Sequence, residues 1–301
     1  MRPEYAEEPC RTALSRVSGM PFRWSLNPYT GCVHQCTFCY VRGFELRAGR
    51  PSGARYGTRI RVKTNLVEVL RCELARKSWQ REEVAFGSAT DPYQPAEGHY
   101  RLSRGAIVAL GEAATPFGMI TRGPLIVRDV DVLQDASAAA EVTVNVSIPT
   151  LDDQVWRTTE PGTAHPRQRL RAVRVLADAG IRVGVGMAPI LPGLSDDPAK
   201  LREVVLAARD AGAAHLWWNV LNLRPGTREH FLERLAIDWP QEVDRYQRLY
   251  ATRAYLPKAA TAKQDATMAE LRSEWVWAPR RRAPTVERSA GASQLELPLA
   301  G

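Results

Sequence analysis

The sequence predicts an α/β protein in which about six strand–helix units build a mainly parallel sheet, a partial (β/α)6 arrangement. Short apolar runs that read as strands alternate with longer stretches whose apolar residues recur at helical spacing. Strands that alternate with helices in this way pair in parallel, and six units are too few to close an eight-stranded barrel. We expect this core at residues 21–256, between a flexible N-terminal arm at 1–20 and a C-terminal tail at 257–301.

The first three strands can be placed from their apolar residues and from the turns that end them. The first alternates through Phe22, Trp24 and Leu26, and Asn27 and Pro28 close it. A loop rich in Gly, Arg and Ser is expected at 43–58, before a helix whose apolar positions begin at Leu66. The next strands are expected at 82–91 and 117–122, with a helix around 107–114 between them and another helix starting near 128.

The fourth strand, at 141–150, shows the clearest alternation in the chain. Its valines at 142, 144 and 146 fall on one face, opposite Thr143, Asn145 and Ser147. A helix at 166–179 should end at Gly180, and a helix through 201–208 at Gly212, because glycine is a common C-terminal stop. Strands at 181–190 and 213–223 and helical segments to about residue 255 complete the core.

Composition indicates a globular protein with no membrane segment. No apolar run approaches the roughly 18 residues that span a bilayer, and the N-terminus lacks the apolar core of a signal peptide. We therefore expect a cytoplasmic protein. The net charge of +8 favours nucleic acid only slightly, because 36 of the 41 basic residues are arginine, a skew that a GC-rich genome produces without selection for phosphate contacts.

Three of the five cysteines, Cys32, Cys36 and Cys39, are spaced C-x3-C-x2-C directly after the first strand. Cys10 and Cys72 do not supply the second pair of a four-cysteine zinc site, and a disulfide framework is unusual in a long chain without a secretory signal. Three thiolates on one loop suit three irons of a cubane cluster whose fourth iron stays open. A zinc site or a cluster of buried thiols is the alternative.

The stretch around these cysteines, NPYTGCVHQCTFCY at residues 27–40, resembles the signature of the radical S-adenosylmethionine (SAM) superfamily, with the aromatic Phe38 before the last cysteine. The wider string resembles the DNA-repair-photolyase-like branch, relatives of spore photoproduct lyase, from about residue 20 to residue 256. The resemblance implies an open barrel, a [4Fe-4S] cluster, SAM and a flavodoxin- or ferredoxin-type reductant. It also implies a lyase-like enzyme that cleaves SAM to a 5′-deoxyadenosyl radical, which takes hydrogen from the substrate.

The same resemblance places SAM contacts at the carboxyl ends of the strands. Ser88, Thr90 and Asp91 would receive the amino group, with an Asx turn made by Asp91 before Pro92 as the alternative. Arg122 would pair with the carboxylate, unless it is a solvated charge. Asn145 and Ser147 would line the lumen, and Ser147 matches the family's hydroxyl ligand to SAM.

Glycines on one face of the fifth strand favour close approach by another group. Gly184, Gly186 and Ala188 share that face, and either adenosine or tight side-chain packing could occupy the space. Tyr40 matches a catalytic position near SAM, with a buried aromatic as the alternative, and His34 is either a fourth iron ligand or a neighbour of the cluster. Glu160 and Arg169 match family positions to which no role can be assigned from the sequence.

The substrate is the least determined feature. Ser88 stands where photoproduct lyase carries its hydrogen-donating cysteine, and a hydroxyl is a far poorer donor, so we expect that reaction to be absent or poor. One candidate substrate is nucleic acid in a DNA-repair-like reaction, and the alternative is RNA, a peptide or a metabolite. A further interpretation is that the protein is not an enzyme but an iron–sulfur electron carrier or sensor. The end of the chain, QLELPL from Gln294 to Leu299, resembles peptides that dock on the DNA sliding clamp.

Overall fold

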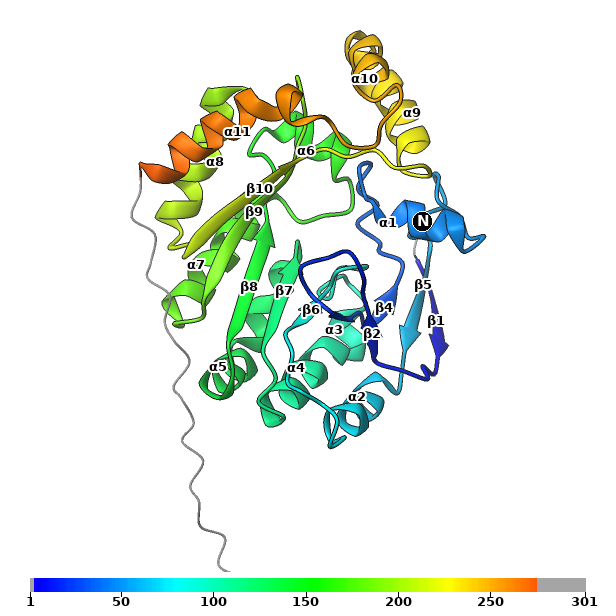
Figure 1. Ribbon diagram of the computed structural model, residues 1–301, viewed down its shortest axis with the longest axis vertical. Helices are drawn as coiled ribbons and strands as arrows, with labels where there is room; N and C mark the ends of the chain where they lie inside the picture. Colours follow the sequence, from blue (N-terminus) through cyan, green and yellow to red (C-terminus); the bar gives the residue numbers. More distant parts are fainter. Residues whose placement is uncertain (1–2, 275–301) are drawn as a thin grey trace, which may run out of the picture.

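The computed structural model describes residues 3–274 and is built around an open sheet with six parallel strands (Figure 1). These strands are β3 (Trp24–Leu26), β6 (Val84–Phe86), β7 (Phe117–Thr121), β8 (Val142–Ser147), β9 (Val183–Ile190) and β10 (His215–Val220). Each pairs in parallel with the next one along the chain. An antiparallel strand, β2 (Leu14–Arg16), forms the edge opposite β10, so the described sheet does not close. The predicted partial barrel of six β/α units is confirmed.

Helices follow the parallel strands and cover the outer face of the sheet (Figure 1). The predicted stops are confirmed, since Gly180 and Gly212 adopt φ values of 78° and 82° directly after two of these helices. Within residues 3–274 no helix combines the length and apolarity needed to cross a membrane. The larger helices are α2 (Leu66–Leu74), α4 (Leu102–Glu112), α5 (Val130–Ala139), α7 (Pro166–Asp178), α8 (Pro198–Asp210) and α9 (Arg228–Asp238), and the shorter ones are α1 (Val41–Arg47), α3 (Glu97–Tyr100), α6 (Asp153–Thr159) and α10 (Val243–Leu249).

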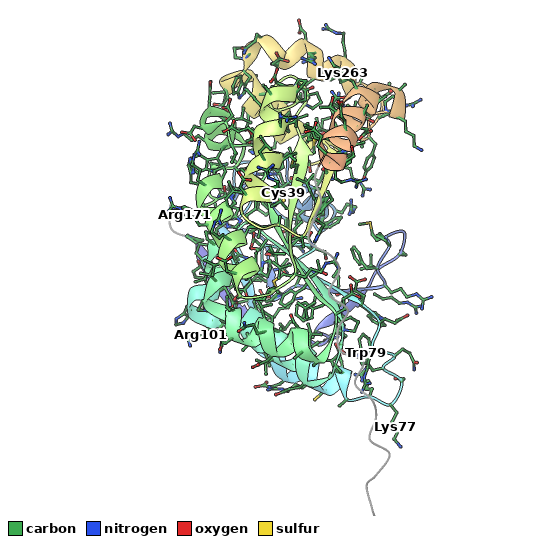
Figure 2. All side chains as sticks on the ribbon, turned by 90° about the vertical axis from the view of Figure 1, so that its left-hand side faces the viewer. Cys39, Lys77, Trp79, Arg101, Arg171 and Lys263 are labelled. Atoms are coloured by element: carbon green, nitrogen blue, oxygen red, sulfur yellow. The ribbon has the colours of Figure 1, made fainter. Side chains whose placement is uncertain are left out.

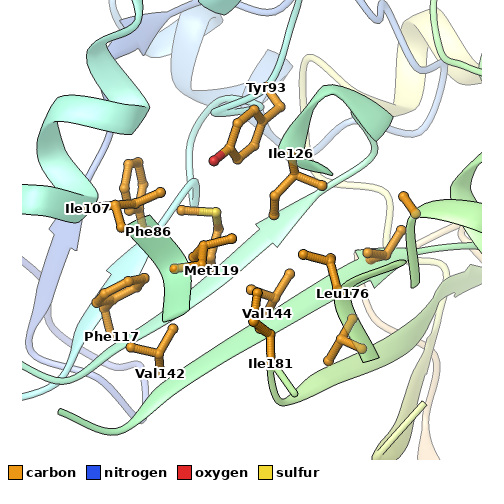
Figure 3. Close-up of a cluster of buried hydrophobic side chains, with 14 of the residues drawn as sticks. Phe86, Tyr93, Ile107, Phe117, Met119, Ile126, Val142, Val144, Leu176 and Ile181 are labelled. Carbon is orange, nitrogen blue, oxygen red and sulfur yellow. The ribbon is translucent and has the colours of Figure 1, made fainter. Parts of the chain in front are cut away.

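The main core lies between the parallel strands and these helices. On β8 the valines at 142, 144 and 146 are buried, whereas Thr143 and Asn145 on the other face are half-buried. Figure 3 shows Val142 and Val144 packed with Phe117 and Met119 of β7 and with Leu176 of α7. Each such side chain stabilises the fold by about 1.5–3 kcal/mol. The polar row of β8 therefore faces the inside of the open barrel, as its alternation predicts.

Both ends of the described chain are more ordered than the sequence analysis expects. In the predicted arm at 1–20, β1 (Glu4–Glu8) pairs with β5 (Arg59–Lys63), which also pairs with β4 (Tyr29–Thr30), and β2 pairs with β3. The strands β1 and β2 escape detection because most of their residues are exposed, which removes the apolar alternation.

The predicted tail and the predicted loop at 43–58 also contain helices. The tail at 257–301 begins with α11 (Lys258–Ser273), which buries Met268 and Leu271, too few apolar positions to give a clear helical period. The predicted loop begins inside α1. The buried positions of this helix include Arg42, Gly43 and Glu45, which are not apolar, so the sequence shows no apolar helical period there. The hexapeptide at 294–299 lies outside the described residues, so clamp docking stays a prediction.

Candidate active site

The three cysteines line one cavity at the carboxyl ends of β3, β6 and β7. The cavity has a volume of about 90 Å³. Cys32 and Cys36 are buried, Cys39 is half-buried, and all three thiols are free. In the view of Figure 2, Cys39 lies between Lys263 and Lys77, and closer to Lys263. The structure brings these predicted site residues to the same cavity: Tyr40, Ser88, Thr90, Asp91 and Arg122.

Arg42 fixes the shape of the cysteine loop from behind. Its guanidinium is buried and donates hydrogen bonds to the carbonyl oxygens of Gln35 (3.0 Å) and Cys36 (3.2 Å). It also donates to the carbonyls of Ser52 and Gly53, each at 2.7 Å, and so ties the cysteine loop to the following loop. Sequence reasoning assigns no role to Arg42, because an arginine on a helix usually reads as a solvated charge.

Asp91 joins the cysteine loop to the ends of β6 and β7. Its Oδ1 accepts hydrogen bonds from the Thr121 hydroxyl (2.6 Å) and from the backbone N–H of Tyr93 (2.8 Å), which is the Asx turn anticipated from the sequence. Its Oδ2 accepts from the backbone N–H of Arg122 (2.7 Å) and lies 3.3 Å from Nδ1 of His34. Burial alone would raise the pKa of Asp91, but His34 and these donors lower it to about 2. Four donors account for both carboxylate oxygens.

Replacing Asp91 by alanine is expected to lower the free energy of unfolding by about 3–5 kcal/mol, because it leaves buried donors without an acceptor. Asp197→Ala is a matched control that removes only the N-cap of α8 and should cost about 1 kcal/mol. Urea unfolding followed by circular dichroism measures both changes. Equal losses in the two variants would show that Asp91 is not a structural junction.

The Arg122 side chain lies between the cysteine cavity and a buried ion pair. Its Nε donates to Oε1 of Glu160 at 2.7 Å, and Nη2 donates to the carbonyl of Ala188 at 3.0 Å. Its guanidinium also lies over the Phe38 ring, 5.6 Å from the centroid. Within the described residues Nη1 has no hydrogen-bond partner, so Arg122 keeps a donor for a ligand in the cavity that it lines.

Glu160 and Arg169, to which the sequence gives no role, hold Arg122 in place. Both side chains are fully buried, and Arg169 Nη1 lies 3.1 Å from Oε1 of Glu160. Arg169 also donates to the carbonyls of Ser147 (2.9 Å) and Ala164 (2.8 Å). Burial alone would raise the pKa of Glu160, but Arg169 and Arg122 lower it, so the carboxylate stays ionised. Two arginines sharing one buried carboxylate form a rigid support beside the cavity.

The remaining residues near the cavity are held by hydrogen bonds, two of them to backbone carbonyls. Thr90 donates from its hydroxyl to the Gly31 carbonyl at 2.6 Å, a bond that braces the cysteine loop. Tyr40 is exposed rather than buried, and its hydroxyl donates to the Ser88 carbonyl. The Ser88 hydroxyl is 3.4 Å from Nδ2 of Asn27. These residues have the positions expected for a ligand site, and their contacts with SAM stay predictions.

Five further candidates do not line the cysteine cavity: Phe38, Asn145, Ser147, Gly186 and Ala188. Ser147 is buried and donates to the Ala188 carbonyl at 3.3 Å, which also accepts from Arg122. Asn145 lines a separate cavity of about 380 Å³, which lies at the amino ends of the parallel strands. Its Oδ1 accepts from Nε1 of Trp217 at 2.8 Å, so Asn145 is not brought to the cysteines.

Side chains of β10 fill the space above the glycines of β9. A Cβ atom on Gly184 would lie 2.2 Å from Nε2 of His215, and one on Gly186 would lie 2.6 Å from Cζ2 of Trp217. Tight packing, the second of the two explanations weighed from the sequence, thus accounts for both glycines. A contact between Gly186 or Ala188 and adenosine stays a prediction.

The three free thiols of this cavity suit the ligands of an iron–sulfur cluster. Among residues 3–274 no three Cys, His, Asp or Glu side chains converge closely enough to hold one metal ion. A cubane cluster binds each cysteine to a different iron, so its ligands lie further apart. Burial raises the pKa of the Cys36 and Cys39 thiols, and bound iron would offset this by stabilising the thiolates. His34 points its Nδ1 at Asp91, as a neighbour of the cysteines.

Comparisons with known proteins agree with this chemistry. The model of the radical SAM superfamily matches residues 26–205. An uncharacterized protein of Mycobacterium tuberculosis is 39% identical over 251 residues, which are 82% of this chain and 74% of that protein. The radical SAM Nalpha-GlyT isomerase of Pseudomonas phage M6 is 29% identical over 170 residues, 56% of this chain and 33% of the phage protein.

A solved structure shares the fold. Spore photoproduct lyase in complex with dinucleoside spore photoproduct superposes with a TM-score of 0.68 and covers 90% of this chain and 79% of the lyase. The two sequences are 17% identical, so this likeness concerns the arrangement of strands and helices. The open parallel sheet described above is the partial barrel of that lyase.

Proposed function

The chain belongs to the radical SAM superfamily, and from this premise we propose that Cys32, Cys36 and Cys39 each bind one iron of a [4Fe-4S] cluster. Enzymes of this superfamily use such a cluster together with SAM, so the chain is an enzyme of the radical SAM class. The observation that carries the proposal is that three free thiols and Arg122 line the same cavity. A reductant of the flavodoxin or ferredoxin type and a reducing, cytoplasmic compartment complete the proposal.

When bound, the cluster supplies the electron that cleaves SAM into methionine and a 5′-deoxyadenosyl radical. The residues of this chain orient SAM and exclude water. We propose that Arg122 holds the SAM carboxylate through Nη1, since Glu160 already fixes the other side of the guanidinium. Ser88, Thr90 and Tyr40, which line the same cavity, would border the methionine part.

The substrate class that we propose is nucleic acid, as in a DNA-repair-like reaction. Two observations support it: the net charge of +8, and a fold shared with a lyase whose structure is a complex with dinucleoside spore photoproduct. The photoproduct itself is a poor candidate, because Ser88 offers a hydroxyl where a thiol would be the better hydrogen donor. We therefore propose a different hydrogen abstraction from a nucleotide.

Deuterium transfer tests this substrate class. Reduced protein with SAM is incubated with perdeuterated DNA oligonucleotides, with perdeuterated RNA of the same sequence, or without nucleic acid, and 5′-deoxyadenosine is analysed by mass spectrometry. We expect deuterium in 5′-deoxyadenosine with DNA. Deuterium with RNA alone, or with neither polymer while SAM is still cleaved, would contradict a DNA substrate.

DNA that contains spore photoproduct forms a separate arm of the same experiment. Reversal to thymines should be absent or slow relative to SAM cleavage. Efficient reversal would show that a donor other than Ser88 serves the photoproduct-lyase reaction.

A further inference from the structure

A buried tyrosine hydroxyl points at one of the three cysteines. Tyr56 Oη lies 3.6 Å from Sγ of Cys39, within hydrogen-bonding distance for sulfur, and the tyrosine is only 2% exposed. The next residue, Gly57, allows this approach: its φ is 77°, and a Cβ there would lie 2.2 Å from the Cys32 carbonyl oxygen. The loop that carries Tyr56 is thus packed directly against the cysteine loop.

An arginine lies over the face of the same ring. The guanidinium carbon of Arg42 is 4.5 Å from the centroid of Tyr56. Its hydrogen bonds all go to backbone carbonyls, and no carboxylate of residues 3–274 lies within ion-pair distance of it. Within the described residues the buried positive charge of Arg42 is therefore balanced by carbonyl dipoles and by the face of the Tyr56 ring, whose hydroxyl contacts Cys39.

We propose that Tyr56, supported by Arg42, is a positioning residue that tunes the reduction potential of the cluster bound at Cys39. Accepting one electron from the external reductant makes the cluster and its thiolates more negative. A hydrogen bond to a ligand sulfur and a nearby positive charge both stabilise the more negative state. A cation over the ring also draws electron density from the phenol, which makes its O–H a stronger donor. The inference rests on the proposed ligation by the three cysteines.

Tyr56→Phe removes the hydroxyl and keeps the ring. We expect the ratio of reduced to oxidised cluster at a fixed potential to fall about tenfold, the effect of one hydrogen bond to a charged group. For a one-electron couple this is a midpoint potential about 59 mV more negative. An anaerobic redox titration with the EPR signal of the reduced cluster as readout measures it directly, without SAM or substrate.

Tyr250→Phe is the matched control, because its buried hydroxyl donates to the Leu221 carbonyl at 2.6 Å and is not part of the cysteine cavity. Its midpoint potential should equal that of the unmodified protein. Iron content is measured in every sample, so failure of the cluster assignment would appear as missing iron and is distinct from failure of the inference. An unchanged potential in Tyr56→Phe with full iron content would overturn the inference.

If Tyr56→Phe loses iron, a second variant tests the proposed role of Tyr56. A fluorinated tyrosine at position 56 keeps the ring and is a stronger hydrogen-bond donor, so the potential should become less negative than in the unmodified protein. A fluorotyrosine protein with full iron content and an unchanged or more negative potential would overturn the proposed role.

Discussion

Cys36→Ala is expected to abolish SAM cleavage and to remove the stable [4Fe-4S] cluster. Without Cys36, one iron would lose its protein thiolate. Because Cys36 is only 5% exposed, a side chain from the surface cannot reach this position to replace it as a ligand. The unmodified protein, reconstituted without oxygen, should carry about four irons per chain, because Cys10 and Cys72 are too few to hold a second cluster. Iron and sulfide analysis together with the absorption spectrum measures the loss.

Cys72→Ala is the matched control for this prediction. Cys72 is exposed on α2 and does not line the cavity, so its removal should leave iron content and SAM cleavage unchanged. Retained activity in Cys36→Ala, or about eight irons per chain in the unmodified protein, would be incompatible with a single cubane cluster on three cysteines.

Arg122→Ala is expected to weaken SAM binding about 10- to 150-fold while the iron content stays the same. The reason is the loss of a charge-assisted hydrogen bond of about 1.5–3 kcal/mol to the SAM carboxylate. The Cys32, Cys36 and Cys39 side chains do not depend on this guanidinium for a hydrogen bond. Equilibrium dialysis of labelled SAM against the oxidised protein measures binding without cleavage.

Arg128→Ala provides the comparison for that variant. Arg128 also pairs with buried carboxylates, Glu97 at 2.9 Å and Asp129 at 2.7 Å, but it does not line the cysteine cavity. Its loss should cost stability and leave SAM affinity unchanged. If Arg122→Ala and Arg128→Ala bind SAM equally well, Arg122 is a structural arginine and the proposed carboxylate contact is wrong.

The features that the sequence predicts well depend on local pattern. The valines of β8 alternate with polar residues because one face of the strand packs on helices, and the stops at Gly180 and Gly212 follow from backbone conformation. The cysteine spacing is also local, since three thiols within eight residues of a loop can reach one centre. The order of the six parallel strands follows from these local units.

The features that the sequence misses depend on partners far along the chain. Glu160 meets Arg122 across 38 residues, and Tyr56 meets Cys39 across 17 residues, with no motif to signal either contact. The glycines of β9 suggest a ligand until the rings of His215 and Trp217 are placed above them. Asp91 could not be assigned to a ligand or to a turn from the sequence, because its four donors come from three different segments.

The most direct test of the central claim is the measurement of 5′-deoxyadenosine formed from SAM by the reconstituted, anaerobically reduced protein. We predict equal amounts of 5′-deoxyadenosine and methionine, formed only when reductant is present and absent in Cys36→Ala. A protein that holds about four irons and binds SAM, yet forms no 5′-deoxyadenosine after reduction in the presence or absence of nucleic acid, would contradict a radical SAM reaction at this cavity.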